Sequence, residues 1–125
     1  MSEFLKALSI TASGLRAQAN RLKHVAENLA NADTPGYRRK TIAFKSEHDG
    51  KVKTGPVRLD RTKLMQIHDP THPLADQNGN YSGSNVNLIF ELADAREAQR
   101  SYEANLKIFE QTRKMSSGLL QLLRK

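Results

Sequence analysis

The sequence predicts a mainly α protein in which long N- and C-terminal helices form a coiled-coil-like pair, joined by an irregular middle segment with short β-strands or a hairpin. Apolar residues near both ends recur in alternating steps of three and four, which places them along one side of a helix. Between residues 35 and 86 this period is lost and turn-forming residues are frequent. Of the 125 residues only 38% are hydrophobic, so two such helices bury little surface alone.

The first helix is predicted to run from about Ser2 to Ala30, within an N-terminal segment 1–34. Ser2 is a suitable N-cap, and Glu3 suits the first turn of a helix. Pro35 disfavours helical angles at the residue before it, and Gly36 permits a turn, so the helix ends there. Its apolar stripe alternates large with small side chains, which permits close approach of another helix, and consists of Leu5, Leu8, Ala12, Leu15, Ala19, Leu22, Ala26 and Leu29.

The middle segment, residues 35–86, is predicted to contain short strands separated by turns. Its apolar and β-branched residues favour strands at 37–44, 57–59 and 64–67. Glycine and proline predict turns at Gly50 and at Gly55-Pro56. Further turns are expected at Asp69-Pro70, at His72-Pro73 and at Asn78-Gly79, the last of which is typical of a tight hairpin.

The second helix is predicted over 87–123, within a C-terminal segment 87–125, with Asn87 as its cap and Glu91 in its first turn. Its stripe consists of Leu88, Leu92, Ala95, Gln99, Tyr102, Leu106, Phe109, Arg113, Ser116, Leu120 and Leu123. A flanking strip beside it adds Ile108, Met115, Leu119 and Leu122. One partner helix cannot cover both sides, so we expect contacts with other subunits. The alternative is a small closed bundle in which the middle segment folds over the strip.

The net charge of +7 is concentrated in the middle of the chain, because residues 36–64 contain nine basic and three acidic side chains. A basic patch suits nucleic acid, an anionic membrane or an acidic protein surface. Tyr37 and Phe44 lie near the cluster Arg38-Arg39-Lys40 and can stack on bases. The cluster is short, however, and both helices have nearly balanced charge, so an acidic protein partner is favoured over nucleic acid.

Few residues of this chain suggest catalysis or metal binding. Cysteine is absent, which excludes disulfides, thiolate metal ligands and cysteine nucleophiles. His68 and His72 have a chelating spacing, but Pro70 and Pro73 oppose the helix that would align them. No phosphate-binding loop, zinc-protease helix or nucleophile elbow is present. We therefore expect no enzyme activity and no cofactor.

A calcium loop is imitated at residues 76, 78 and 80, where an aspartate is followed by two asparagines at alternate positions. The turn glycine, Gly79, is misplaced, and Asn87 stands where the bidentate glutamate belongs, so hairpin-turn chemistry is the better interpretation. No apolar run approaches the roughly 20 residues that span a bilayer. Glu3 and Lys6 interrupt the first fifteen residues, so no cleaved signal peptide is expected.

A family resemblance lies in residues 13–40, which read SGLRAQANRLKHVAENLANADTPGYRRK. This segment resembles the N-terminal signature of bacterial flagellar rod and hook proteins. Residues 69–81, DPTHPLADQNGNY, together with Asn85-Val86-Asn87 and residues 101–105, resemble the C-type proximal rod proteins of that family. The short middle segment agrees, because hook and distal-rod relatives have large insertions there. Ser84 departs from the usual proline, which leaves the local loop shape open.

The resemblance implies a structural subunit of the proximal rod of the flagellar basal body, the drive shaft that transmits torque from motor to hook. Such proteins lie in the periplasm and reach it through the flagellar type III export apparatus without a cleaved signal peptide. Their terminal helices pack as an inner tube of helical symmetry, and the segment after the first helix links subunits outward. The implied partners are copies of the chain, other rod proteins and the export apparatus, with no nucleic acid and no membrane span.

Two sets of residues are expected to make the subunit contacts. The first packs helices of neighbouring subunits and consists of Leu8, Leu15, Leu22, Ala26, Leu29, Leu92, Tyr102, Leu106, Phe109, Met115, Leu119 and Leu122. The second belongs to the linker and consists of Asn31, Gly36, Tyr37, Arg38 and Arg39. Two other function classes remain open from the sequence: a free-standing helical adaptor, and a small basic nucleic-acid-binding protein.

Overall fold

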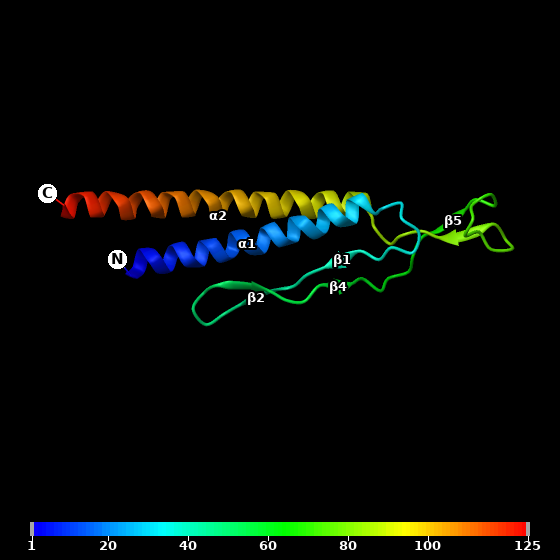
Figure 1. Ribbon diagram of the computed structural model, residues 1–125, viewed down its shortest axis with the longest axis horizontal. Helices are drawn as coiled ribbons and strands as arrows, with labels where there is room; N and C mark the ends of the chain where they lie inside the picture. Colours follow the sequence, from blue (N-terminus) through cyan, green and yellow to red (C-terminus); the bar gives the residue numbers. More distant parts are fainter. Residues whose placement is uncertain (1, 125) are drawn as a thin grey trace.

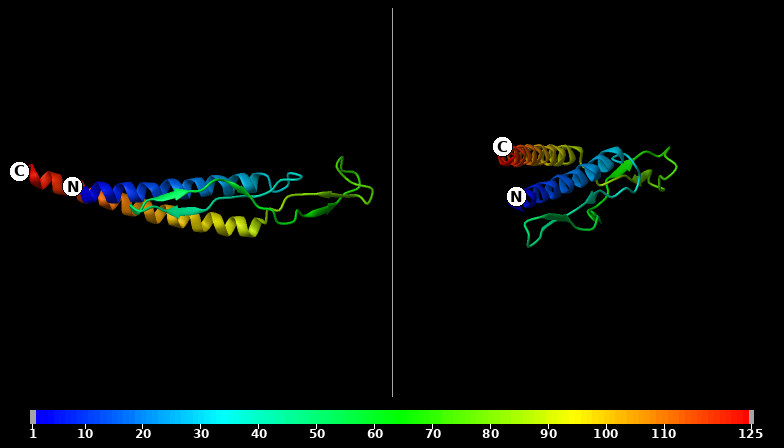
Figure 2. Two further views of the ribbon diagram at one scale, coloured as in Figure 1. Left: turned by 90° about the horizontal axis from the view of Figure 1, so that it is seen from below. Right: turned by 60° about the vertical axis from the view of Figure 1, so that its left-hand side comes forward.

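The computed structural model describes residues 2–124 and has an elongated shape dominated by two antiparallel helices that lie side by side (Figure 1). Helix α1 spans Ser2–Ala30 and helix α2 spans Leu88–Leu123. The start of α1 and the end of α2 lie at the same end of the molecule, and a hairpin projects from the other (Figures 1 and 2). The two predicted terminal helices are therefore confirmed, as is a middle segment of short antiparallel strands.

The predicted helix boundaries have the expected local causes. Helix α1 ends at Ala30, and in the turns that follow it Gly36 adopts a φ of +75°, a left-handed conformation that glycine accepts without strain. At the start of α2, the side chain of Asn87 accepts hydrogen bonds from the backbone N–H groups of Ile89 and Phe90 at 3.0 and 3.3 Å. Asn87 is thus the N-cap, which satisfies two of the free donors at the start of the helix.

The described residues contain six short strands in three antiparallel pairs. Strand β1 (Lys40–Thr41) pairs with β4 (Arg58–Leu59), and β2 (Phe44–Ser46) pairs with β3 (Val52–Thr54). Strand β5 (Gln66–His68) pairs with β6 (Asn80–Ser82). The first two pairs form one interrupted hairpin, residues 40–59, which we call the arm. The third pair forms the projecting hairpin.

The arm changes register at Gly55-Pro56. Three positions separate Thr41 from Phe44 on the outgoing side, whereas four separate Thr54 from Arg58 on the return. The return side thus has one residue more than the outgoing side. This extra residue lies next to Pro56, which has no N–H and cannot donate a hydrogen bond to the opposite strand. The pairing resumes on either side because the N–H of Gly55 still reaches the carbonyl of Ala43 at 2.8 Å.

The arm lies along α1, as all three ribbon views show (Figures 1 and 2). The backbone N–H of Val52 donates to the hydroxyl of Ser13 at 3.0 Å, and that hydroxyl donates in turn to the carbonyl of Ile10 at 2.6 Å. Gly50 turns the arm with a φ of +86°. A Cβ at Gly50 would lie 3.3 Å from Cδ1 of Ile10, so the arm tip rests against the helix.

The projecting hairpin differs from the predicted one. Strands β5 and β6 are joined by the eleven residues 69–79, so a two-residue turn does not join them directly. The tight turn expected at Asn78-Gly79 is nevertheless present within this loop, because the N–H of Gly79 donates to the Asp76 carbonyl at 3.0 Å and the N–H of Asp76 donates to the Asn80 carbonyl at 2.8 Å. In the same turn the Asp76 carboxylate accepts from the N–H groups of Asn78 and Asn80, both at 2.9 Å. His72 stacks on Tyr81 with ring centroids 3.9 Å apart, which closes the long loop over its own strand.

The predicted strands are partly confirmed. Strands β4 and β5 fall within or beside the expected segments 57–59 and 64–67, whereas the expected strand 37–44 is observed only at 40–41 and 44. Strands β3 and β6 were not expected, because Val52–Thr54 and Asn80–Ser82 show too little apolar alternation. Their pairing is imposed by partners across each hairpin instead of by their own pattern.

Contacts between α1 and α2 recur every seven residues along α1. They involve small or polar side chains, and the buried apolar residues of the chain are mostly small as well: Ala17, Val25, Val86 and Ala98. The contacting pairs are Gly14 with Asn105, Arg21 with Asp94, and Asn28 with Glu91. The two helices are therefore paired, whereas coiled-coil packing of their leucine stripes remains a prediction.

Three leucines of the α1 stripe lie beside these contacts and are half-buried. Leu15, Leu22 and Leu29 each follow a contacting residue by one position, which rotates them by about 100° around the helix. None of the three is fully buried, and Ala26 of the same stripe is exposed. The leucines that suggested a coiled-coil seam in the sequence thus retain surface that their own chain does not cover.

Candidate assembly surfaces

A cluster of polar side chains joins both helices to the arm, and we call it the polar junction: Asn28, Tyr37, Arg39, Lys40, Asp60, Asn85 and Glu91. Asn28 is completely buried, and its side chain makes four hydrogen bonds with three residues. Its Oδ1 accepts from the Tyr37 hydroxyl at 2.9 Å and from the Lys40 N–H at 2.8 Å. Its Nδ2 donates to the Lys40 carbonyl at 3.0 Å and to Glu91 Oε2 at 3.3 Å. Every hydrogen-bonding capacity of the amide is therefore used.

Glu91 is also completely buried, and its charge is compensated by Arg39. Nε of Arg39 donates to Oε1 of Glu91 at 2.5 Å, and Nη1 of the same guanidinium lies 3.4 Å from Oδ2 of Asp60. Burial opposes the charge of Arg39, but the hydrogen bonds to Glu91 and Asp60 and the negative charges of these two carboxylates together outweigh it and raise the pKa of Arg39. A buried carboxylate without this partner would be strongly destabilising.

Asp60 and Asn85 connect the junction to the return strand of the arm. The N–H of Thr62 donates to Asp60 at 2.8 Å, and this hydrogen bond is the main reason that the pKa of Asp60 is lowered. Asn85 accepts from the Arg39 N–H at 2.7 Å and donates to the Asp60 carbonyl at 2.9 Å. The segment before α2 is therefore tied to both sides of the arm.

The basic cluster Arg38-Arg39-Lys40 is engaged inside the chain. Arg38 donates to the backbone carbonyls of Asp60 and Thr62 at 3.3 and 3.0 Å. Lys40 pairs with Glu27 at 2.7 Å, which lowers the pKa of Glu27 and raises the pKa of Lys40. These cations hold the arm against the helices, so they do not form the free basic patch that the sequence suggested.

The remaining linker residues also have partners within the chain. The side chain of Asn31 donates to the Glu27 carbonyl at 2.9 Å and accepts from the Thr34 hydroxyl at 3.1 Å. The N–H of Gly36 lies within hydrogen-bonding distance of the carbonyls of Ser82 and Gly83, at 3.2 and 3.1 Å. Contacts of Asn31, Gly36, Tyr37, Arg38 and Arg39 with another subunit remain a prediction.

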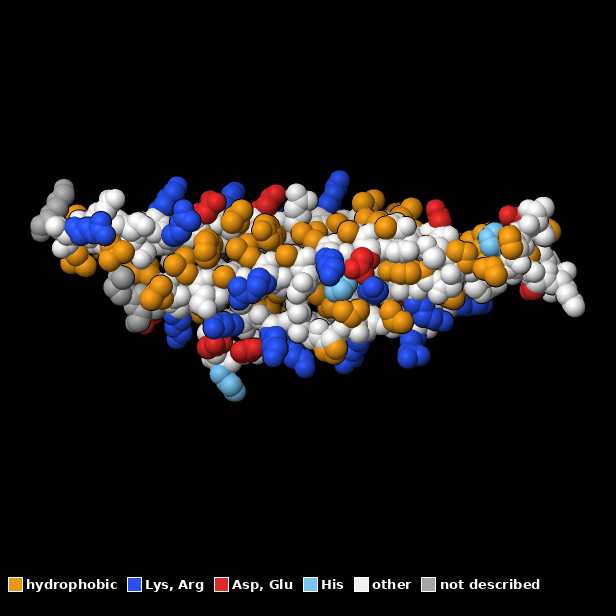
Figure 3. Space-filling model, viewed as in Figure 1, with side chains coloured by type: hydrophobic (Ala, Val, Ile, Leu, Met, Phe, Trp, Pro, Cys, Tyr) orange, Lys and Arg blue, Asp and Glu red, His pale blue; other side chains and the backbone are white. Residues whose placement is uncertain are grey.

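The predicted subunit-packing residues lie at the surface or are half-buried within the chain. The half-buried ones are Leu8, Leu15, Leu22, Leu29, Tyr102, Leu106 and Phe109. The exposed ones are Ala26, Leu92, Met115, Leu119 and Leu122. Figure 3 shows hydrophobic side chains along both helices on the face in view. Large exposed apolar areas of this kind mark surfaces that another molecule covers, although these particular contacts remain a prediction.

Five basic side chains of the middle segment are exposed and have no ion-pair partner within residues 2–124: Lys45, Lys53, Arg58, Arg61 and Lys63. In the space-filling view, basic side chains line the edge of the molecule formed by the arm (Figure 3). The unpaired positive charge of the middle segment is therefore on the arm and the segment after it, and the cluster at 38–40 contributes little to it.

Sequence reasoning missed the polar junction. Asn28 belonged to the family-like segment but not to the apolar stripe, and Glu91 was interpreted only as a first-turn acid. One pattern in the sequence does point to the helix contact. Small or polar residues recur every seven positions, each directly before a leucine of the stripe: Gly14, Arg21 and Asn28. Within the described residues, no three histidine, aspartate or glutamate side chains are arranged to hold a metal, and no helix is long and apolar enough to cross a bilayer.

Comparison with known proteins agrees with this arrangement of terminal helices. Residues 2–38 match the family described as flagella basal body rod protein, and residues 77–122 match the C-terminal family of flagellar basal body rod FlgEFG proteins. The flagellar basal-body rod protein FlgC of Agrobacterium fabrum is 43% identical, over 99% of this chain and 98% of the relative. FlgC of Salmonella typhimurium is 33% identical, over 94% and 96%. The chain belongs to the FlgC family of flagellar basal-body rod proteins.

Proposed function

We propose that the chain is a subunit of the proximal part of the rod and helps to transmit torque from the motor to the hook. Membership of the FlgC family makes it a structural rod protein of the flagellar basal body and not an enzyme. The observation that supports the assembly mechanism is the exposed apolar surface of both helices. A shaft under torque is better served by many distributed contacts than by one site.

Coiled-coil packing of the leucine stripes would be completed between subunits. The chain's own helix contact uses Gly14, Arg21 and Asn28, which leaves Leu15 and Leu22 to meet a neighbouring helix. The segments 1–34 and 87–125 would together form an inner tube, and 35–86 would extend outward from it. The position of the arm along α1, with its unpaired cations, supports this division.

Two further parts of the proposal concern place and partners. The rod would lie in the periplasm, and the chain would reach it through the flagellar type III export apparatus without a cleaved signal peptide. Its neighbours would be copies of itself and other rod proteins. The family resemblance of residues 13–40 and 69–87 supports both parts, and contacts that repeat without closing generate a helical filament of this kind.

The proposal is tested by placing a charge in each stripe. Leu22→Asp and Leu106→Asp should abolish rod assembly and swimming, because a carboxylate would be buried without a partner. Arg100→Asp is the matched control, since it puts the same side chain on an exposed position outside the stripes. Basal bodies purified from each strain are probed for the chain, and motility is scored on soft agar. Normal rods and swimming in both leucine variants would refute the proposed packing.

A further inference from the structure

One edge of the arm's β2–β3 pair is not paired with another strand. In an antiparallel ladder, every second residue points its backbone N–H and C=O groups away from the opposite strand. The N–H of Gly55 donates to the Ala43 carbonyl at 2.8 Å, so alternate positions from Ala43 onward bond to β3. The backbone groups of Phe44 and Ser46, which lie between those positions, therefore point away from β3. We call the backbone of these two residues the free edge.

Helix α1 covers the opposite edge of the pair. Val52 on β3 also points its backbone outward, and its N–H donates to the Ser13 hydroxyl of α1 at 3.0 Å. The free edge of β2 thus lies on the side of the hairpin away from this contact. All three residues of β2 are exposed, and within residues 2–124 the backbone of Phe44 and Ser46 has no partner. An exposed edge of this kind is a template for a further strand.

The free edge is flanked by positive charge. Lys45 on β2 lies directly opposite Lys53 on β3, and both side chains are exposed. Like charges at opposed positions destabilise a strand pair. Glu47, two positions after Lys45, forms an ion pair with neither lysine. A carboxylate placed beside Lys45 would therefore relieve a repulsion that the chain leaves uncompensated.

The other face of the strand pair borders a cavity that is partly aromatic. The cavity has a volume of about 420 Å³, and its apolar walls are Ile42 and Phe44 of the arm and Phe90 of α2. Among its polar lining residues, Arg21 and Asp94 pair with each other. Successive side chains of a strand point to opposite faces. A strand added at the free edge would therefore direct alternate side chains toward the lysines and toward this cavity.

We propose that the free edge binds an extended acidic segment of another protein, which pairs with β2 as a further strand. Hydrogen bonds to the backbone of Phe44 and Ser46 would hold the segment, as in other cases of strand addition. An acidic residue opposite Lys45 would lie on the same face as both lysines and would select the partner. The inference goes beyond the proposed function, since it adds a partner outside the packing of the helices.

A second copy of the chain does not suit the free edge. Antiparallel pairing of two β2 strands through Phe44 and Ser46 would bring the Lys45 side chains of both copies together. Lysine on an edge strand opposes such pairing of like with like, whereas it favours an acidic strand. Nucleic acid and lipid cannot continue a β-ladder, so the unpaired backbone groups favour a polypeptide.

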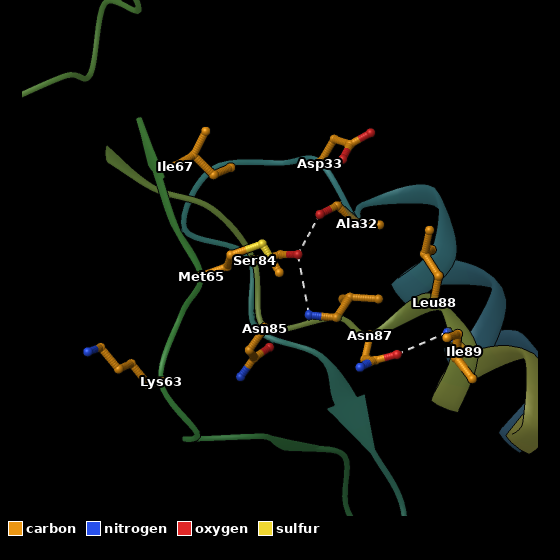
Figure 4. A pocket seen from close by; sticks show the side chains of 11 residues that line it. Ala32, Asp33, Lys63, Met65, Ile67, Ser84, Asn85, Asn87, Leu88 and Ile89 are labelled. Carbon is orange, nitrogen blue, oxygen red and sulfur yellow. Dashed lines mark hydrogen bonds between the residues drawn. The ribbon is translucent and has the colours of Figure 1, made fainter. Parts of the chain in front are cut away.

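Strand β5 also has an outer edge, which differs in its surroundings. The N–H of Gly83 donates to the Met65 carbonyl at 2.7 Å, so the backbone groups of Gln66 and His68 point away from β6. Neither strand of this pair contains a lysine. Figure 4 shows the apolar side chains of Met65 and Ile67 along the same segment. The β5 edge therefore has nothing that selects an acidic strand, and it provides an internal control.

Binding of a peptide to the full chain tests the inference. The probe is a short peptide of alternating valine and glutamate, and amide hydrogen exchange is read for each residue by NMR. With the probe, the amides of Phe44 and Ser46 should exchange at least about tenfold more slowly, whereas those of Gln66 and His68 should not change. A valine–lysine peptide should give no protection. A probe with methylated backbone amides, which keeps its charge but cannot pair, should bind at least about tenfold more weakly.

Two variants of the chain separate backbone pairing from charge. Ser46→Pro removes an N–H of the free edge but none that bonds to β3, and proline is tolerated at such edge positions. It should abolish the protection at Phe44 while the thermal melt of the chain stays the same. Lys45→Glu should lose the valine–glutamate probe and bind the valine–lysine peptide instead. Arg61→Glu is the matched control, because it makes the same charge change on an exposed cation outside both strands.

Three results would overturn the inference. Binding of the probe without slower exchange at Phe44 and Ser46, or equal binding of the methylated probe, would show that charge alone holds the peptide. Protection of these amides in the concentrated chain without peptide would make a second copy the occupant. Binding of phosphatidylglycerol vesicles through Lys45, without binding of the probe, would assign the lysines to a lipid surface. None of these measurements depends on rods, so each result would leave the proposed function intact.

Discussion

The amide of Asn28 on α1 donates a hydrogen bond to the carboxylate of Glu91 on α2 over 3.3 Å, and both side chains are completely buried. The same two residues hold the arm, through Lys40 and Arg39. One contact therefore fixes the angle between the helices and the position of the middle segment. A subunit that transmits force needs such a junction, since its parts must move together.

Removal of the Glu91 carboxylate should destabilise the chain severely. Glu91→Ala leaves Arg39 partly buried without its main partner, and loss of one member of a buried ion pair costs about 3 kcal/mol or more. Glu97→Ala is the control, because Glu97 makes an exposed 3.4 Å pair with Arg21 that is worth well under about 1 kcal/mol. Urea unfolding of both variants, followed by helical circular dichroism, measures the difference. Equal effects would show that Glu91 is not a structural centre.

Glycine substitutions distinguish the helix contact from the free surface. A Cβ on Gly14 would lie 3.0 Å from Nδ2 of Asn105, whereas nothing lies within 4 Å of one on Gly118. Alanine is favoured over glycine in a helix by about 0.8–1.0 kcal/mol. Gly118→Ala should therefore stabilise the purified chain by about that amount, and Gly14→Ala should give less or become destabilising. Thermal melts check this, and equal gains would mean that the helices are looser at Gly14.

Much of the fold could be predicted because its causes are local. The cap at Asn87, the stop at Pro35-Gly36 and the turn at Gly50 each depend on one or two residues and their neighbours. The apolar period located both helices to within a residue or two of their observed ends. These features need no knowledge of what lies across the fold.

The orientation of the helices could not be predicted in the same way. Leucine is the usual residue of a helix seam, yet the chain pairs its helices through Gly14, Arg21 and Asn28. Their partners on α2 are about 60 to 90 positions away in the sequence, so no local pattern identifies them. Likewise, Arg38-Arg39-Lys40 resembled a free basic patch until Glu91, Glu27 and Asp60 were found beside it.

Attachment of the arm to α1 should depend on one hydroxyl. Ser13→Ala removes the acceptor for the Val52 N–H, so the Val52 amide should exchange with deuterium faster. The Gly55 amide, which donates to the Ala43 carbonyl within the arm, should be little affected and is the internal control. Unchanged exchange at Val52 would show that the arm is held by its other contacts and not by Ser13.

The Lys40–Glu27 pair predicts how stability changes with pH. The pKa of Glu27 is below its ordinary 4.5 because Lys40 donates a hydrogen bond to it, and the pKa of Lys40 is above its ordinary 10.5 for the same reason. The stability that Glu27 contributes is thus present above pH 4.5 and lost as the pH falls through its lowered pKa. The contribution of Lys40 is present below pH 10.5 and lost as the pH rises through its raised pKa.

Glu27→Gln should accordingly lower the free energy of unfolding at neutral pH and have little effect in acid. Urea unfolding of the variant and the unmodified chain, repeated from neutral pH to well below 4.5, gives this difference. Glu110→Gln is the control, because Glu110 is exposed and has no ion pair within the described residues. A difference that persists undiminished in acid would mean that the pair contributes through packing and not through charge.

The last prediction separates folding from assembly at a single position. Ala26 lies in the α1 stripe and is exposed within the chain, so Ala26→Leu should leave the stability of the purified chain within about 0.5 kcal/mol. In the rod, where a neighbouring helix is proposed to cover the stripe, the larger side chain should overpack the contact at a cost of about 1–3 kcal/mol. Swimming and the amount of the chain in purified basal bodies should both fall.

Arg100→Leu is the matched control, because it adds a leucine to an exposed position outside the stripes. It should leave both folding and rods nearly unchanged. If Ala26→Leu destabilised the purified chain, the stripe would already be covered inside one subunit, as in a closed bundle. If rods formed normally, Ala26 would face water in the assembled shaft, and the subunit contact would have to lie on another side of α1. The proposed packing, in which neighbouring subunits cover the α1 stripe, therefore requires that the Ala26→Leu chain is stable when purified and that its rods are defective.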